Sequence, residues 1–174
     1  MRKLFFLLSL IIGIQAQAQT GKIRTYSSND WDYWEISYDG NSGKIRTYSS
    51  NDWDYWEYSF GGTSGKIRTY SSEDWDYWEV DNSLKIRTYS SEDWDYWEIT
   101  GSGVNLKVRT YSSEDWDYWE ISGDATGKMR TYSSNDWDYW EISGNLSGLS
   151  KQAQVACMFV AVFTSSINIQ GLLK

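Results

Sequence analysis

A fourteen-residue phrase that recurs six times is the feature that most constrains the fold of this chain. It reads Lys-Ile-Arg-Thr-Tyr-Ser-Ser-(Asn/Glu)-Asp-Trp-Asp-Tyr-Trp-Glu, and only its second and eighth positions vary. The six copies begin at Lys22, Lys44, Lys66, Lys85, Lys107 and Lys128. A period of about twenty residues is typical of proteins that stack one supersecondary unit on the next. Chemistry that is present six times over favours a repeated binding surface rather than a single catalytic centre.

Each copy of the phrase predicts a β-hairpin. Residues 22–26 and 31–36 are short, rich in aromatic and β-branched side chains, and separated by four turn-forming residues. Neither block shows the 3.6-residue stripe of a helix. Folding the first copy about residues 27–30 pairs Tyr26 with Trp31, Thr25 with Asp32, Arg24 with Tyr33, Ile23 with Trp34 and Lys22 with Glu35. Each of these pairs is chemically complementary, which favours this register.

Six hairpins in a row predict an all-β antiparallel meander of about twelve short strands, forming a single-layer or curled sheet. The sequence leaves open whether the sheet curls into a barrel or a two-layer sandwich. The alternative is a parallel β-solenoid, in which residues 22–26 would pair with residues 44–48. Stacking of identical repeats would place like charges about 4.8 Å apart, which destabilises a sheet. We therefore expect the antiparallel arrangement.

Alternation along the strands assigns two faces to this sheet. One carries Ile23, Trp34 and Ile36, and we expect it to be the better buried. The other is polar and paved with rings, and carries Lys22, Arg24, Tyr26, Trp31, Tyr33 and Glu35. The connectors between hairpins differ from one another, whereas the inner turns are uniform, so we expect function on the uniform edge and its adjoining faces.

The N-terminal residues 1–18 read as a signal peptide. Arg2 and Lys3 form a positive region, residues 4–14 are apolar, and Ala16-Gln17-Ala18 is a typical cleavage site. An uncleaved anchor is the alternative, but the apolar run is shorter than the roughly 20 residues that span a bilayer. We expect an exported protein (periplasmic, cell-surface or secreted), of bacterial type, with no transmembrane span after cleavage.

The remaining chain divides into a six-hairpin domain, residues 19–148, and a C-terminal segment, residues 149–174. Residues 155–163 are nine consecutive apolar residues, too few to span a membrane. Ser147 or Ser150 could cap a helix running to about Phe163, although a strand is also compatible with the valines. Repeat arrays need a distinct terminal unit, so we expect this segment to cover the open end of the sheet.

Charge and cysteine content narrow the classes of partner. The formal net charge is −8, and it becomes −10 without Arg2 and Lys3. Because the acidic residues are spread along the array, we expect a surface that repels nucleic acid and anionic lipid. Cys157 is the only cysteine, which excludes an intramolecular disulfide, and the chain contains no histidine. The commonest general base and metal ligand is therefore missing.

The aromatic residues give the strongest indication of function. All 12 tryptophans and 12 of the 14 tyrosines lie in the phrase. Flat rings flanked by arginines and carboxylates suit the apolar faces and hydroxyls of sugars, although the same rings could simply hold a thin sheet together. The candidate ligand-binding residues are Arg24, Tyr26, Trp31, Tyr33, Arg46, Tyr48, Trp53, Tyr55, Arg68, Tyr70, Trp75, Tyr77, Arg87, Tyr89, Trp94, Tyr96, Arg109, Tyr111, Trp116, Tyr118, Arg130, Tyr132, Trp137 and Tyr139.

The repeated carboxylates suggest two further functions. Asp30, Asp32 and Glu35 could supply oxygens to calcium, but they match neither the EF-hand loop nor the nonapeptide calcium repeat. They are equally explained by a turn, a bond from Thr25 and a salt bridge to Lys22. Glycoside hydrolysis needs two differently tuned acids across a cleft, whereas these acids recur on six equivalent surfaces. We expect no enzyme activity, catalytic residues, resident metal or cofactor.

In its repeat length and its pattern of hairpins, the array of residues 22–143 resembles MORN repeats and the choline-binding repeats of cell-wall proteins. That resemblance implies aromatic-rich hairpins. The Gly-x-Gly spacings and the Gly-Trp and Trp-Tyr-Tyr signatures of those families are absent, so their ligand-binding residues do not transfer. The sequence favours a non-enzymatic protein that binds a repetitive polysaccharide or envelope glycan. The alternatives are a structural or self-associating component, which an exposed edge strand would promote, and a calcium-binding repeat protein.

Overall fold

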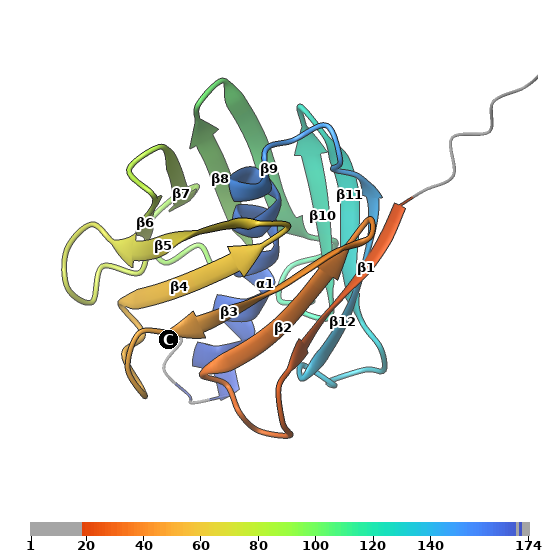
Figure 1. The fold of residues 1–174 in the computed structure, drawn as a ribbon. Helices are drawn as coiled ribbons and strands as arrows, with labels where there is room; N and C mark the ends of the chain where they lie inside the picture. Colours follow the sequence, from red (N-terminus) through yellow and green to blue (C-terminus); the bar gives the residue numbers. More distant parts are fainter. Residues whose placement is uncertain (1–18, 170, 172–174) are drawn as a thin grey trace, which may run out of the picture.

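The chain forms a closed antiparallel β-barrel with one helix inside it (Figure 1). The computed structural model describes residues 19–169 and 171, so the predicted signal peptide lies outside the described residues. The strands are β1 (Gln19–Thr25), β2 (Tyr33–Tyr38), β3 (Asn41–Thr47), β4 (Tyr55–Phe60), β5 (Thr63–Thr69), β6 (Tyr77–Val80), β7 (Leu84–Thr88), β8 (Tyr96–Gly101), β9 (Val104–Thr110), β10 (Tyr118–Gly123), β11 (Thr126–Thr131) and β12 (Tyr139–Asn145). The helix is α1 (Lys151–Ile169).

Every strand pairs with its neighbours in sequence, and β1 pairs with β12 to close the barrel. The predicted antiparallel meander is therefore confirmed, and the parallel solenoid is excluded because β1 does not pair with β3. Of the arrangements that the sequence left open, the sheet adopts the barrel. Closure pairs the outer edges of β1 and β12, which would otherwise be a template for another strand.

The predicted register inside each hairpin is wrong by two residues. Arg24 faces Glu35, where Tyr33 was expected, and Lys22 faces Ser37, where Glu35 was expected. The Tyr26 amide donates to the Tyr33 carbonyl at 2.9 Å, so the inner turn spans residues 27–32 and not only four residues. A two-residue shift keeps every side chain on its face, so the predicted inner position of Ile23, Trp34 and Ile36 is confirmed.

The predicted pairs do form, but between neighbouring hairpins. Across β2 and β3, Tyr33 faces Arg46, Trp34 faces Ile45 and Glu35 faces Lys44, and the Thr47 hydroxyl donates to the Asp32 carboxylate at 3.1 Å. Each strand thus has one register toward its hairpin partner and another, offset by two residues, toward the next hairpin. Six such offsets accumulate the stagger that a twelve-stranded barrel needs to close with tilted strands.

The connectors between hairpins are tighter than their length suggests, because the strands run into them. Asp39-Gly40 and Gly61-Gly62 all have positive φ angles, between 50° and 82°, which is the geometry of two-residue hairpin turns matched to strand twist. Gly21, the residue before the first phrase, lies so close to β2 that an added Cβ would sit 1.9 Å from the Ser37 carbonyl oxygen. A glycine there permits the close approach of two strands in a strongly curved sheet.

The barrel interior is a ring of indoles packed around the helix. Trp34 and its five equivalents are at most 1 % exposed. The rings of Phe159 and Phe163 on α1 meet the ring of Trp78 edge-on, with centroids 5.0 and 4.6 Å apart. The Trp34 indole N–H donates to the Trp31 carbonyl at 2.9 Å, so its polar atom is satisfied inside the core. The same fourteen-residue phrase therefore supplies both the strands of the barrel and the indoles that pack around the helix.

The C-terminal segment was expected to cover the open end of the sheet, and this prediction is wrong: α1 fills the barrel (Figure 1). The helical alternative is confirmed, with the Ser150 hydroxyl accepting from the Ala153 amide at 3.2 Å as a cap. The helix runs on to Ile169, six residues beyond the expected end. It is long and apolar enough to cross a membrane by composition, but it is mostly buried within the barrel. A closed sheet with apolar side chains inside needs a filling, not a lid.

Candidate functional site

The outer wall of the barrel carries one repeated pattern of side chains. We use the term outer wall for the outward-facing residues of the strands. In each hairpin the first strand presents lysine and arginine, followed by the tyrosine that opens the turn, and the second strand presents tyrosine and glutamate, as in Tyr33 and Glu35. Two positions after the glutamate stands a serine or threonine, such as Ser37, except in the third hairpin, where it is Asp81. Arg24 and Tyr33 lie on this wall, as predicted from alternation.

The most exposed aromatic residues are the tyrosines that precede each inner turn. Tyr26 and its equivalents Tyr48, Tyr70, Tyr89, Tyr111 and Tyr132 are 60–68 % exposed. Each packs against the tyrosine that opens the second strand, with ring centroids 4.7–5.1 Å apart. Five of these pairs are stacked, and the Tyr26–Tyr33 pair is edge-on. Stacking fixes one ring face and leaves the opposite face toward solvent.

A cation covers the second tyrosine of every pair. The Lys44 ammonium lies 5.6 Å from the centre of the Tyr33 ring, and Lys66 lies 5.2 Å from that of Tyr55. Such contacts are cation–π interactions between neighbouring hairpins. Hydrogen bonding to the Tyr55 hydroxyl also raises the pKa of Lys66 above its ordinary value. These lysines are therefore held against the wall as charged groups.

The wall arginines divide into two kinds. Four of them form ion pairs with the glutamate opposite, the shortest being Arg24–Glu35 at 2.7 Å and Arg46–Glu57 at 3.1 Å. Arg87 and Arg130 instead lie over the rings of Tyr77 and Tyr118, at 5.1 and 4.8 Å from the centroids. A guanidinium stacked by its face keeps its N–H donors at the edge for another acceptor.

The tryptophans predicted to share this face do not lie on it. Trp31 is 8 % exposed and tilts against Trp34 with centroids 5.8 Å apart, and Trp53, Trp75, Trp94, Trp116 and Trp137 are partly buried against the core. The reason is the longer inner turn, which takes Trp31 out of the strand and folds it over the mouth of the barrel. Of the predicted site residues, the structure brings together arginines and tyrosines, and places the tryptophans beneath the turns.

Those turns form a continuous structure that we call the turn rim: residues 27–32, 49–54, 71–76, 90–95, 112–117 and 133–138. Asp54 links one turn to the next, accepting from the Ser72 hydroxyl at 3.1 Å, the Glu73 amide at 3.0 Å and the Trp75 indole at 2.8 Å. The expected bond from Thr25 to Asp32 is replaced by one from Thr47 of the next repeat. The second aspartate of each phrase therefore has a structural partner.

The acidic residues recur in every repeat, as expected, but on the folded protein most of them gather at the turn rim. The turn rim holds twelve aspartates and three glutamates with no lysine or arginine. The wall strands hold twelve lysines and arginines against six glutamates. A chain with a negative total charge therefore presents a wall with an excess of positive charge. The argument from net charge alone against anionic partners does not apply to that wall.

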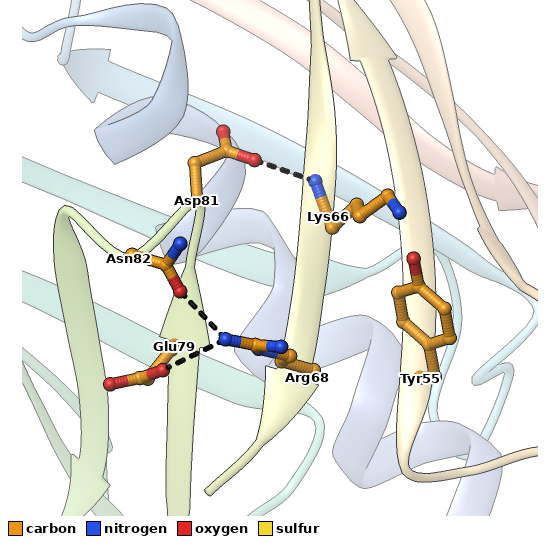
Figure 2. Close-up of a pocket in the computed structure, with 6 residues that line it drawn as sticks. All are labelled: Tyr55, Lys66, Arg68, Glu79, Asp81 and Asn82. Carbon is orange, nitrogen blue, oxygen red and sulfur yellow. Dashed lines mark hydrogen bonds and ion pairs between the residues drawn. The ribbon is translucent and has the colours of Figure 1, made fainter.

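Grooves are recessed into the outer wall, and three of them are well defined among the described residues. The largest, of about 640 Å³, lies over β5 and β6 and is lined by Tyr55, Lys66, Arg68, Glu79, Asp81 and Asn82 (Figure 2). There the Arg68 guanidinium donates to Asn82 at 2.8 Å and lies 3.7 Å from the Glu79 carboxylate. The other two grooves, of about 570 and 320 Å³, lie over β12 and β4. These volumes are in the range of small-molecule sites.

Beside the largest groove, Asp81 is held by two donors. The Lys66 amide donates to it at 2.8 Å, and the buried Tyr58 hydroxyl donates to its second oxygen. Burial, followed by the contact with Asp81, raises the pKa of Tyr58 above its ordinary value. Tyr58 is therefore a neutral donor that fixes the turn, and the groove wall is rigid at this point.

A fourth hollow, of about 490 Å³, lies at the turn rim between Trp94, Trp116 and Trp137 and is bordered by acidic residues of the fourth and fifth repeats. In the described residues no three carboxylate, cysteine or histidine side chains converge as metal ligands. Since Asp32 and its equivalents accept hydrogen bonds from neighbouring turns, their oxygens are largely committed to the rim.

The sequence prediction of the site omitted three residue types that line the grooves: the lysine that opens each phrase, its last glutamate, and the small residue two positions later. Along β1, Lys22 points to the same side as Arg24, and along β2, Glu35 and Ser37 point to the same side as Tyr33. Alternation had therefore placed Lys22 and Glu35 on this face. The two-residue error in register concealed their role, because it paired Lys22 with Glu35 as a closed salt bridge.

Comparison with protein-family models, with curated proteins and with solved structures gives no match.

Proposed function

We propose that the protein is a non-enzymatic glycan-binding barrel, whose six tyrosine pairs and adjoining arginines contact a polysaccharide or envelope glycan. The observation that carries this proposal is the exposure of Tyr26 and its five equivalents, each packed against a second tyrosine, edge-on for Tyr26 and stacked for the other five. A fixed, solvent-facing ring is a platform for the C–H face of a sugar, and the ordering cost of binding is small when the ring is already held.

The groups around each platform suit sugar hydroxyls. Glu35 offers carboxylate oxygens, Arg46 and Lys44 offer donors, and all three lie beside Tyr33 on the wall. Polar groups at fixed positions around an aromatic surface provide orientation and specificity in small-ligand sites. The combination of platform, donors and acceptor recurs in each repeat.

The barrel makes this a radial array and not a flat one. Neighbouring exposed tyrosines are roughly 12 Å apart, from two strand spacings and a two-residue offset. Because the wall is convex, one glycan chain running around it reaches only two or three platforms before the surface turns away. The array would therefore bind several chains at once, and avidity would come from bridging them.

Two alternatives, self-association and calcium binding, have less support. Strand addition would need an unpaired sheet edge, and β1 and β12 are paired with each other. Self-association through exposed tyrosines is instead an outcome that ultracentrifugation of the free protein would reveal. Calcium binding would have to use the Asp32 series, whose oxygens already accept from the next turn.

The test is binding of the mature chain to a panel of soluble and insoluble glycans, followed by substitution of three adjacent platforms. The variant Tyr48→Ser, Tyr70→Ser, Tyr89→Ser should lose at least about tenfold in affinity for a polymeric glycan, because multivalent contacts are removed. The matched control changes exposed rim residues of the same three repeats, Ser49→Ala, Ser71→Ala and Ser90→Ala, and should bind as the parent. Absence of binding to every glycan on the panel would refute the proposal.

A further inference from the structure

The three wall grooves are versions of one repeated feature. In the groove over β4, Glu57 lies between Arg46 of its own hairpin and Lys66 of the next, while the small Ser59 lies between Lys44 and Ser64. Because long side chains surround the short Ser59, the surface is depressed at this position. The groove over β12 repeats this arrangement, so it is a property of the hairpin lattice and not an accident of one loop.

The groove over β12 lies where the barrel closes, and we call it the seam groove. It brings together the first and last hairpins: Lys128 faces Ser143, Arg130 faces Glu141, and Lys22 faces Glu141 from the other side. Three cations therefore border a groove of about 570 Å³ that contains one carboxylate. Its floor is formed by Ser143 beside Thr20, which offer a hydroxyl-lined surface.

Arg130 is not committed to Glu141. The ion pairs among the described residues join other arginines to their glutamates, and Arg130 lies with its guanidinium over the Tyr118 ring. Lys22 lies 5.5 Å from the centre of the Tyr139 ring, and hydrogen bonding to that tyrosine raises its pKa. Two positive groups are thus held on aromatic rings at the border of the groove.

In the fourth repeat a larger residue stands at the position of the small serine. Thr100 replaces the small serine and faces Lys85 on one side and Asn105 on the other. Thr100 carries one methyl group more than Ser143, which leaves less room between the surrounding long side chains. Lys85, Arg87 and Lys107 are therefore equivalent in charge to the seam cations, but they line none of the three wall grooves.

We propose that the wall grooves, and the seam groove foremost, bind the anionic sugar residues of an acidic polysaccharide, one carboxylate or sulfate per groove. This rests on the proposed glycan-binding function and names its ligand class. The cations take the acidic group, the glutamate and serine take ring hydroxyls, and the adjacent tyrosine takes the sugar face. The geometry requires no catalytic step.

The probe that isolates the acidic group is a pair of short oligogalacturonates that differ only in methyl esterification. Titration calorimetry of the mature chain at low salt should give at least about tenfold tighter binding to the free acid. The preference should shrink as salt is raised past the point where exposed charges are screened. Sulfated and neutral dextrans of equal length form a second pair, which separates sulfate from carboxylate as the favoured anion.

The variant test compares two triple substitutions of equal charge. Lys22→Gln, Lys128→Gln, Arg130→Gln empties the seam groove of cations, and Lys85→Gln, Arg87→Gln, Lys107→Gln removes the same charge outside the three wall grooves. The first should lower by one the number of sites that prefer the free acid to the methyl ester. The second should weaken affinity at its own platforms, because Arg87 adjoins a tyrosine pair, and should leave the number of acid-selective sites unchanged. Circular dichroism and melting temperature establish that both variants are folded.

The outcomes separate this inference from the proposed function. Equal binding of acid and methyl ester, or equal losses in the two triple variants, would overturn the acidic-sugar assignment while leaving glycan binding intact. Binding of no glycan would refute both. Single-stranded DNA bound as tightly as oligogalacturonate would also overturn it, because charge without sugar recognition would then suffice.

Discussion

The turn rim and the outer wall are built from the same fourteen residues, yet they differ in charge and in how their polar groups are used. On the rim, carboxylates such as Asp54 accept several hydrogen bonds from the neighbouring turn. On the wall, charged side chains make exposed ion pairs and ring contacts, as Arg24 does with Glu35. Polar groups that are similar in sequence therefore hold the fold together at one end and remain accessible along the side.

The largest test of this difference is the loss of a rim carboxylate. Asp54→Ala should lower the free energy of unfolding by about 3 kcal/mol, because three donors, including the Trp75 indole, lose a charged acceptor. The control is Asp52→Ala, which removes the same charge two residues away. Among the described residues the Asp52 carboxylate accepts a single hydrogen bond, from the Ser49 hydroxyl at 3.5 Å, so a cost near 0.5 kcal/mol is expected. Equal costs in urea unfolding would contradict the interlocked rim.

A second test concerns the residue at the eighth position of the phrase. It has φ near +60° in all six repeats, a region that asparagine tolerates better than glutamate. The triple variant Glu73→Asn, Glu92→Asn, Glu114→Asn should raise stability by about 1.5 kcal/mol, through relief of backbone strain and of repulsion on the acidic rim.

The reverse change, Asn51→Glu, serves as the control and should lower stability by a few tenths of a kcal/mol. Adding salt should stabilise the parent more than the triple variant, since it screens the rim. A lower melting temperature for the triple variant would show that the three glutamates have a favourable role in the fold.

Loss of a wall ion pair should matter much less than loss of a rim carboxylate. Arg68→Ala removes the contacts with Glu79 and Asn82, yet the arginine side chain is more than half exposed, so a cost of about 0.5 kcal/mol is expected. Chemical unfolding at low and high salt measures it. A cost comparable to that of Asp54→Ala would remove the distinction between the two regions.

The smallest expected effect is on a wall lysine. Tyr55→Phe removes the hydroxyl whose hydrogen bond raises the pKa of Lys66, so that pKa should fall toward its ordinary value with little change in stability. Lysine side-chain NMR follows this titration in the alkaline range. An unchanged Lys66 titration would mean that the ring alone holds the lysine.

Much of this fold can be predicted from the sequence alone. Most of what was not predicted follows from the two-residue error in the register within each hairpin. Strand type, faces and the inner position of Trp34 follow from alternation, because burial depends only on parity. The choice between two registers of equal parity depends on both neighbours of a strand. If Arg24 had faced Tyr33 within the hairpin, as Arg46 does across the next interface, the two offsets would cancel and the strands would not tilt. Closure thus depends on the two-residue difference that a single hairpin cannot reveal.

The site was predictable to a similar extent. Arginines and tyrosines of the wall follow from parity, whereas Trp31 does not, since its place depends on turn length. The helix was recognisable from Ser150 and the apolar run that follows, but its position inside the barrel depends on a lumen that exists only after closure. Segregation of charge between rim and wall likewise depends on the turn geometry.

Closure also fixes the number of repeats. In an open repeat array, gain or loss of one unit by recombination lengthens or shortens the protein and leaves the other units intact. Here β1 must meet β12, and the ring of tryptophans must fit the circumference of α1. A seventh hairpin would widen the lumen and open voids around Phe159. A barrel of only five hairpins would have no room for the helix. Near-identical repeats are prone to copy-number change. In this molecule the size of the enclosed helix restricts the number of hairpins to six.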